Sequence, residues 1–181
     1  QTETQLTLAD IRRQLVARGY QEAITNSFVD AGLEGVLDPG NEPIPLANPL
    51  SADLSVMRTS LWPGLIKSLI YNKNRQQNRI RLFETGLRFI QPPNQQQVQF
   101  DDIQQDQVLA GVACGARSPE LWSNATESVD FFDVKGDLES ILVLTGDLEG
   151  FTFEKASHPA LHPGQPAAIR RGEEGLGYLG L

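Results

Sequence analysis

The sequence predicts an α+β fold in which helices flank an antiparallel or mixed sheet. Three segments show the periodicity of amphipathic helices, and several short apolar or alternating runs are typical of strands. The two kinds of element do not follow one another in the regular order of βαβ units, which argues against a purely parallel sheet. The 181 residues suffice for a buried core, and we expect residues 1–181 to form a single module.

The first helix is predicted between Thr7 and Gly19. Thr7 is a good N-cap, Asp10 suits the positive end of a helix, and glycine commonly follows a helix. The inner face is apolar at i, i+3, i+7 and i+8, with Leu8, Ile11, Leu15 and Val16. Residues 21–29 then predict a strand in which Ile24 and Phe28 are buried. Residues 32–37 predict a helical turn, and three prolines at positions 43, 45 and 49 allow at best an edge strand.

The second helix is predicted from Thr59 or Ser60, with Pro63 in its first turn, where a missing N–H costs little. Its apolar stripe covers nearly half of its circumference and consists of Leu61, Trp62, Leu65, Ile66, Leu69 and Ile70. A stripe this wide is typical of a helix that packs on a sheet and also on a partner. Residues 80–90 then predict a long strand, or a hairpin broken at Gly86.

The second half of the chain predicts an exposed loop over residues 91–107, because the seven glutamines, two prolines and three aspartates of residues 92–107 cannot build a core. The apolar run 108–114 is typical of a buried central strand, so Cys114 is interpreted as a core thiol rather than a nucleophile. A third helix is predicted from Asp130 to Gly146. Residues 150–154 predict a strand, and residues 167–171 and 176–181 predict a hairpin.

The net charge of −8 is unevenly distributed along the chain. Residues 1–90 hold 10 basic and 9 acidic side chains, a charge of +1, whereas residues 91–181 hold 5 and 14, a charge of −9. The acidic balance argues against a general nucleic-acid-coating protein. The local basic run consists of Lys67, Lys73, Arg75, Arg79, Arg81 and Arg88. It is either a solvated face or a patch for an acidic partner or a phosphate backbone.

Several classes of protein are excluded by composition. One cysteine excludes an intramolecular disulfide and a cysteine-based zinc site. No apolar run approaches the roughly 20 residues of a membrane span, and no signal-peptide pattern is present. The first residues lack an initiator methionine, so we expect a fragment of a longer chain. From the composition as a whole we expect this fragment to be soluble and cytoplasmic.

No catalytic, cofactor-binding or metal-binding motif is predicted. A P-loop and a G-x-S-x-G elbow are absent from the sequence, and the G-x-G at 175–177 lacks a strand–turn–helix context. His158 and His162 have the spacing of metal ligands, but a proline follows each and favours a rigid turn. The alternatives for the acidic residues of the third helix are an acid/base or Mg²⁺ cluster and the wet face of a helix, which we favour; they are Asp130, Asp133, Asp137 and Glu139.

Five ordered motifs resemble the β subunit of bacterial phenylalanyl-tRNA synthetase. They comprise residues 48–51 with 57–65, residues 71–76, 81–89, 133–139 and 161–165, and together they extend over essentially the whole chain. The resemblance implies the catalytic-like module of that family, an antiparallel sheet flanked by helices and related to the class II synthetase catalytic domain. It also implies that the editing region and the anticodon-binding-like domain lie outside these residues, and that the module continues slightly past Leu181.

In that family the α subunit activates phenylalanine with ATP and Mg²⁺ and charges the tRNA, while the β module packs against α in an (αβ)₂ heterotetramer. The resemblance therefore implies a non-catalytic assembly module without a cofactor of its own. The segment 61–74 falls where class II enzymes place their interface-forming first motif. The implied subunit-interface residues are Arg58, Leu61, Trp62, Leu65, Leu69, Asn72 and Arg75.

Arg81 and Glu84 fall near the second class II motif, whose arginine would hold ATP in a working enzyme. The arginine-bearing third motif is not visible, so we expect these two positions to be vestigial. Two alternatives stay open: a module that contacts tRNA through residues 67–88, and a nucleotide-binding enzyme domain that uses Arg81 and Glu84.

Overall fold

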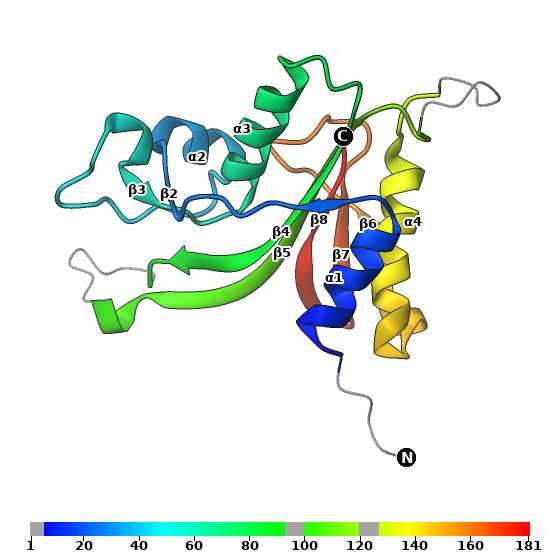
Figure 1. Ribbon diagram of the computed structural model, residues 1–181. Coiled ribbons are helices and arrows are strands. Elements are labelled where there is room, and N and C mark those ends of the chain that lie inside the picture. Colours follow the sequence, from blue (N-terminus) through cyan, green and yellow to red (C-terminus); the bar gives the residue numbers. More distant parts are fainter. Residues whose placement is uncertain (1–5, 93–99, 120–126) are drawn as a thin grey trace. The chain divides into compact units, whose positions relative to one another are not determined.

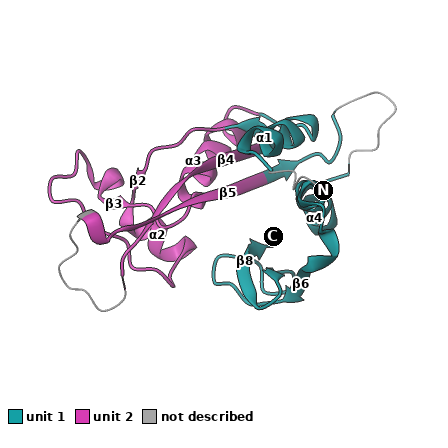
Figure 2. Ribbon diagram, turned by 90° about the horizontal axis from the view of Figure 1, so that it is seen from below, with its two compact units in different colours: residues 1–22, 77–81, 113–181 teal, residues 23–76, 82–112 magenta. Residues whose placement is uncertain are grey.

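The computed structural model describes residues 6–92, 100–119 and 127–181, and it confirms an α+β fold (Figure 1). The chain divides into two compact units (Figure 2). Unit 1 comprises residues 1–22, 77–81 and 113–181, and unit 2 comprises residues 23–76 and 82–112. Strands β4 (Arg79–Ile90) and β5 (Gln104–Gly115) pass through both units. Within the described ranges, no helix is both long and apolar enough to cross a membrane.

Unit 1 is built on helices α1 (Leu8–Ala17) and α4 (Phe131–Leu142), which pack against each other. Both helices begin with a capping box, formed by Thr7 and Asp10 in α1 and by Asp130 and Asp133 in α4. The predicted starts of both helices are therefore confirmed. The 3-10 helices η3 (Val143–Thr145) and η4 (Leu148–Gly150) follow α4.

Unit 1 also contains an antiparallel sheet with the strand order β6-β7-β8. Its strands are β6 (Phe151–Lys155), β7 (Ala167–Arg171) and β8 (Glu174–Leu179). The predicted strand at 150–154 and the predicted hairpin are confirmed, although the second arm of the hairpin begins two residues earlier than expected. This sheet contacts α4 through β8.

Unit 2 begins with a segment in which the predicted strand over residues 21–29 is wrong. The structure has two short strands, β1 (Gln21–Glu22), which belongs to unit 1, and β2 (Phe28–Val29), which belongs to unit 2. Ile24 lies between them and is 92% exposed. Thr25 and Asn26 instead fix the segment through polar contacts, Thr25 with Glu84 and Asn26 with the Phe28 N–H.

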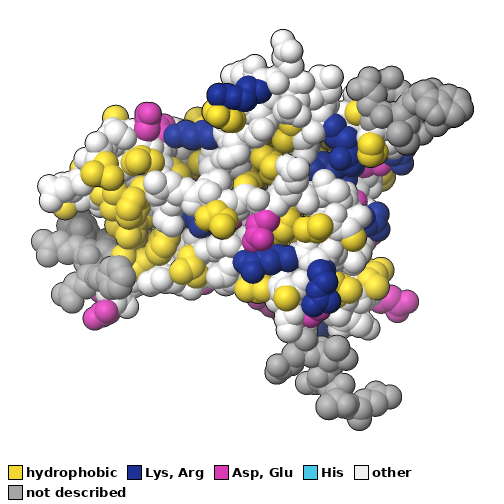
Figure 3. All heavy atoms as spheres, in the orientation of Figure 1, with side chains coloured by type: hydrophobic (Ala, Val, Ile, Leu, Met, Phe, Trp, Pro, Cys, Tyr) yellow, Lys and Arg dark blue, Asp and Glu magenta, His cyan; other side chains and the backbone are white. Residues whose placement is uncertain are grey.

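Two helices, one 3-10 helix and one short strand follow in unit 2. These elements are α2 (Ala31–Leu37), η1 (Ala52–Leu54), β3 (Val56–Met57) and α3 (Trp62–Lys73). Helix α2 packs on α3, and β2 pairs antiparallel with β3. The proline-rich segment adds only an isolated bridge from Pro45 to Val56. Hydrophobic side chains gather over the part of unit 2 that holds β3 (Figure 3).

Strand β4 lies between β1 and β5 in the first sheet, and it is buried from Ile80 to Glu84. It continues through Gly86, so the long strand is confirmed and the hairpin is wrong. The run 108–114 is not the buried central strand, because β5 pairs with β4 only and its residues alternate between exposed and half-buried. Cys114 is a half-buried free thiol. Of the predicted loop, residues 104–107 belong to β5 and residues 93–99 lie outside the described residues.

A buried ion pair between Arg58 and Glu84 crosses the interior of unit 2. Arg58 is 4% exposed and Glu84 is 3% exposed. The Arg58 Nη1 donates to Glu84 Oε1 at 2.8 Å, and its Nε donates to the Leu87 carbonyl at 2.9 Å. The Thr25 hydroxyl donates to the other carboxylate oxygen of Glu84 at 2.7 Å. Both charges are therefore satisfied, which a buried ion pair requires if it is not to destabilise the fold.

Two glycines make room for this ion pair and its threonine. A Cβ at Gly64 would overlap the Thr25 side chain, and a Cβ at Gly86 would lie 2.5 Å from the Arg58 Nη2. Gly64 therefore allows α3 to lie directly on Thr25, and Gly86 allows the guanidinium to pass across β4. An isolated glycine in a helix is otherwise a cost to stability, so close packing explains its presence here.

We expect Arg58→Met to lower the free energy of unfolding by about 3–5 kcal/mol, because it leaves Glu84 buried without a counter-ion. The double variant Arg58→Met/Glu84→Leu should recover much of the loss, because no charge then remains buried. Chemical denaturation followed by circular dichroism measures both changes. Arg75→Met, at an exposed position of the same unit, is the control, and equal destabilisation by the two single substitutions would contradict the prediction.

Candidate functional site

Helix α3 presents two apolar faces that the sequence pattern alone does not separate. Leu61, just before the helix, and Leu65 are 1% and 0% exposed, so they point into unit 2. Trp62, Ile66 and Ile70 follow at intervals of four residues on the other face and stay partly or fully exposed. Ile70 is 50% exposed. The second face is therefore half-buried at Trp62 and Ile66 and becomes exposed at Ile70.

The C-terminal end of α3 adds an aromatic and basic group to this face. Tyr71 is 57% exposed, and the guanidinium of Arg75 lies over its ring, 3.4 Å from the centroid. Lys73 occupies the last turn and, like Lys67, is exposed. Cations near a helix C-terminus interact favourably with the helix dipole. We call Trp62, Ile66, Leu69, Ile70 and Tyr71, with Arg75, the α3 surface.

The predicted interface residues do not lie together on the surface of unit 2. Trp62, Leu69 and Arg75 belong to the α3 surface. Arg58, Leu61 and Leu65 are buried inside unit 2, and Asn72 is half-buried and donates to the Ser68 carbonyl at 2.8 Å. Sequence reasoning left Ile66, Ile70 and Tyr71 out of the site, although the four-residue spacing from Trp62 marks the first two.

Glu34 on α2 fixes the chain where it enters α3. Its Oε1 accepts from the backbone N–H groups of Thr59 and Ser60 at 2.9 and 3.0 Å, and from the Thr59 hydroxyl at 2.6 Å. Glu34 is fully buried, and its Oε2 has no hydrogen-bond partner among the described residues. The Thr59 hydroxyl also lies 2.7 Å from Asp38 Oδ2. A single hydroxyl proton cannot serve two carboxylates, so protonation of one of them removes the conflict.

Burial raises the pKa of Glu34 above its usual range, because desolvation disfavours the charged carboxylate. The hydrogen bonds from Thr59 and Ser60 lower this pKa and oppose the shift only in part. The carboxyl group that positions the start of α3 is thus held closer to its neutral form than an exposed glutamate.

Arg81 and Glu84, the predicted vestigial motif-two positions, belong to different units and different networks. Glu84 pairs with Arg58 in unit 2, as described above. Arg81 is 8% exposed in unit 1, and its Nη1 donates to Asp137 Oδ2 at 2.5 Å. Each charge is neutralised by a partner within its own unit, and the described residues do not bring the two side chains into a common site.

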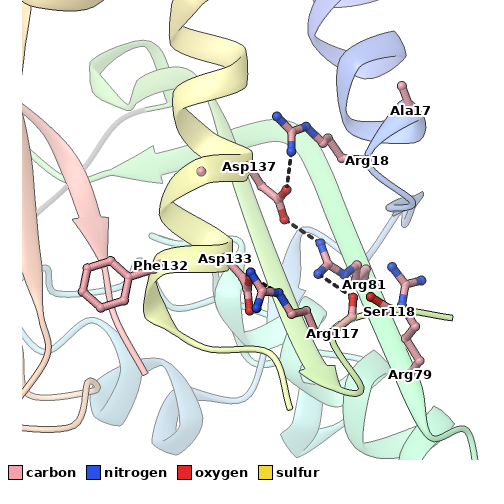
Figure 4. A pocket seen from close by; sticks show the side chains of 10 residues that line it. Ala17, Arg18, Arg79, Arg81, Arg117, Ser118, Phe132, Asp133 and Asp137 are labelled. Carbon is pink, nitrogen blue, oxygen red and sulfur yellow. Dashed lines mark hydrogen bonds and ion pairs between the residues drawn. The ribbon is translucent and has the colours of Figure 1, made fainter. Parts of the chain in front are cut away.

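Unit 1 contains a pocket of about 510 Å³ between the end of α1, the start of β4, the end of β5 and α4. We call it the arginine pocket, and it is lined by Ala17, Arg18, Arg79, Arg81, Arg117, Ser118, Phe132, Asp133, Gly136 and Asp137. Arg18 and Arg81 both point to Asp137, and Arg117 points to Asp133 (Figure 4). The Phe132 ring lies on the other side of α4 and is 75% exposed (Figure 4).

The expectation that the acidic residues of the third helix form a solvent-exposed face is wrong for Asp137. It is 6% exposed and accepts from Arg81, while Arg18 lies 3.5 Å away. The Tyr20 hydroxyl also donates to Asp137, at 3.0 Å, and its pKa is raised by burial and by that carboxylate. Asp130 and Asp133 serve as helix caps. This sharing of one carboxylate joins α1, β4 and α4 of unit 1.

The two histidines form turns, as predicted. Their Nδ1 atoms accept from backbone N–H groups two residues further on, of Ala160 for His158 and of Gly164 for His162. His158 also stacks on Tyr178 at 4.7 Å between ring centroids. No group of three or more metal-ligating side chains occurs in the part of the chain that the structure describes.

We expect the stability difference between the wild-type protein and Glu34→Gln to depend on pH. Because the pKa of Glu34 is raised in the folded state, its contribution is fully present below the unfolded pKa and is lost as the pH rises through the folded pKa. The wild type should therefore lose about 1 kcal/mol per pH unit relative to Glu34→Gln within this window. Denaturation at a series of pH values measures it, with the exposed Glu42→Gln as the control. Parallel profiles for the wild type and Glu34→Gln would contradict the prediction.

Comparison with known proteins gives one consistent family. The family model "Phenylalanyl tRNA synthetase beta chain CLM domain" matches residues 1–181. The chain is 54% identical over 178 residues to the phenylalanine–tRNA ligase β subunit of Pseudomonas putida, covering 98% of this chain and 22% of that protein. It is 51% identical over 179 residues to the subunit of the same name from Sodalis glossinidius, with 99% and 22% covered. The chain thus spans about a fifth of the length of the curated relatives it matches.

The fold is similar to that of a solved pyrrolysyl-tRNA synthetase from Desulfitobacterium hafniense. The TM-score is 0.58 at 15% sequence identity, and the alignment covers 93% of this chain and 56% of that one. At this identity the likeness concerns the fold, and it agrees with the predicted class II synthetase-like architecture. The family match over the whole chain and the identity above one half agree with each other. This chain belongs to the family of phenylalanyl-tRNA synthetase β-chain CLM domains.

Proposed function

We propose that this chain is a non-catalytic assembly module of a phenylalanine–tRNA ligase β subunit, and that its α3 surface packs against the α subunit. The observation that carries the proposal is the exposed face of α3, where Trp62, Ile66 and Ile70 recur every four residues beside Tyr71. A helix whose inner face is already buried by Leu61 and Leu65 gains nothing within unit 2 from a second apolar face. Obligate interfaces are apolar in the same way as a divided core.

The composition of the α3 surface also fits an interface. Trp, Tyr and Arg are the residues that most often anchor binding, and this surface holds one of each. Arg75 is already ordered over the Tyr71 ring, so less side-chain entropy is lost when a partner covers the pair. The buried contacts of Glu34 with Thr59 and Ser60 hold the start of the helix, so the surface is presented by a rigid element.

The proposal assigns the chemistry to the partner. In it, the α subunit binds ATP and Mg²⁺ and attaches phenylalanine to its tRNA, in a cytoplasmic (αβ)₂ heterotetramer. The internal pairing of Arg81 with Asp137 and of Glu84 with Arg58 supports this division. Each of the two charges has an oppositely charged partner within its own unit, as expected of side chains that serve the fold.

A second candidate function is contact with tRNA through the basic end of α3. Lys67, Lys73 and Arg75 are exposed there, whereas Arg88 of the same basic run pairs with Asp106 at 2.9 Å. The three exposed cations of α3 are compatible with an assembly role, because they border the apolar surface. Filter binding of tRNA at several salt concentrations tests this candidate, since each phosphate contact that is lost lowers the salt dependence.

We expect the double variant Trp62→Ala/Ile70→Ala of the full-length β subunit to lower the yield of complex co-purified with α at least about tenfold. The reason is that truncating two anchors at an interface costs more than 1.4 kcal/mol. Affinity purification of tagged α followed by quantification of β measures it. The matched control is Phe132→Ala/Val143→Ala, which removes an exposed aromatic and an exposed aliphatic side chain from unit 1. Unchanged co-purification of Trp62→Ala/Ile70→Ala with α would contradict the proposal.

A further inference from the structure

The arginine pocket of unit 1 has more guanidinium groups than carboxylates to pair with them. Asp137 is shared by Arg81 and Arg18, at 2.5 and 3.5 Å. Arg117 is shared by Asp133 at 2.7 Å and Glu127 at 3.4 Å. Arg79 has no carboxylate within ion-pair distance among the described residues. Four cations thus face three anions, and the residual positive charge falls on Arg79.

Burial makes this residual charge costly. The Nε atoms of Arg79 and Arg81 are inaccessible to water and have no hydrogen-bond partner in the described part of the chain. Desolvation and the neighbouring Arg81 both lower the pKa of Arg79, and Asp137 and Tyr20 oppose this shift only in part. Arg79 is half-buried as a residue, but a guanidinium whose Nε is shielded from water is normally paired or bound to a ligand. The surroundings of Arg79 supply neither.

We propose that the arginine pocket binds a phosphate group, with Arg79 as its principal anchor and Arg18 at its rim. A phosphate carries up to two negative charges and several acceptor oxygens, so it can accept from more than one guanidinium at once. Figure 4 shows the Arg79 guanidinium beside Ser118, and the Arg18 side chain is 46% exposed. A volume of about 510 Å³ admits a phosphate with an attached group.

The site is independent of the proposed assembly role. The α3 surface lies in unit 2, whereas every residue that lines the arginine pocket belongs to unit 1. Unit 1 as a whole holds 10 basic and 14 acidic side chains, a net charge of −4, so nonspecific attraction of anions by the surrounding unit does not explain the positive pocket. The phosphate can be free, on a nucleotide or on RNA, and these sources differ in what displaces it.

The test uses the full-length β subunit in complex with α and measures binding of radiolabelled inorganic phosphate by equilibrium dialysis at low salt. We expect the wild type to bind one more phosphate per β chain than Arg79→Gln, or to bind it at least about tenfold more tightly, because hydrogen bonds to charged groups contribute 1.5–3 kcal/mol. Arg79→Lys should keep part of the affinity. Arg13→Gln, which changes an arginine of unit 1 outside the pocket whose side chain is 77% exposed, should bind as the wild type does. Equal binding by wild type and Arg79→Gln would overturn the proposal.

Two further arms protect the test against misfolding and identify the source. Arg18→Gln changes a side chain that is 46% exposed and removes only the longer of the two ion pairs of Asp137, so weaker binding by this variant supports the site even if Arg79→Gln fails to fold. If Arg18→Gln also binds as the wild type does, the pocket is not a phosphate site. Competition by AMP identifies a mononucleotide ligand, competition by tRNA identifies RNA phosphates, and competition by neither identifies free phosphate. Co-purification with α should be normal in every variant that folds, which separates this inference from the assembly proposal.

Discussion

The interior of this protein depends on the neutralisation of two opposite charges that lie three residues apart on β4. Arg81 and Glu84 are both buried in the middle of the strand. Each needs a counter-ion, because the uncompensated burial of an ion costs several kcal/mol. Asp137 on α4 serves Arg81, and Arg58 serves Glu84 from the loop that precedes α3. The placement of α4 in unit 1 and of the α3 entry in unit 2 therefore follows from the same strand.

The same constraint involves Arg81, one of the two positions that the sequence resemblance places near the second class II motif. An arginine that holds a nucleotide must keep donors free on the side of the ligand. Arg81 gives one Nη to Asp137 and the other to the Arg117 carbonyl at 3.3 Å. The Nε of Arg81 and the Nε of its neighbour Arg79 remain without a hydrogen-bond partner among the described residues. The ion pair of Arg81 with Asp137 helps to hold α4 against β4 in unit 1.

Local signals in the sequence predicted the ends of elements, and long-range pairing explains what could not be predicted. The capping boxes at Thr7 and Asp130 and the β7–β8 turn depend on residues within four positions of each other. Arg81 and Asp137 are 56 residues apart, so periodicity read Asp137 as solvated. The sequence predicted the apolar stripe of α3, but Leu65 and Ile66 both belong to this stripe. The pattern therefore did not show that Leu65 is buried and that Ile66 lies on the outer face. Packing on α2 helps to decide which face of α3 turns inward and which belongs to the candidate site.

The boundary between the two units falls inside paired strands, between Arg81 and Leu82 on β4 and between Val112 and Ala113 on β5. Domain boundaries usually fall in exposed linkers that few contacts cross. Here a cut at either boundary would break a hydrogen-bonded ladder and leave unsatisfied backbone groups on both pieces. We therefore expect that neither unit folds when it is expressed without the other. We also expect insertions and circular permutations to be tolerated at turns, such as that between β7 and β8, and not at the boundaries between the units.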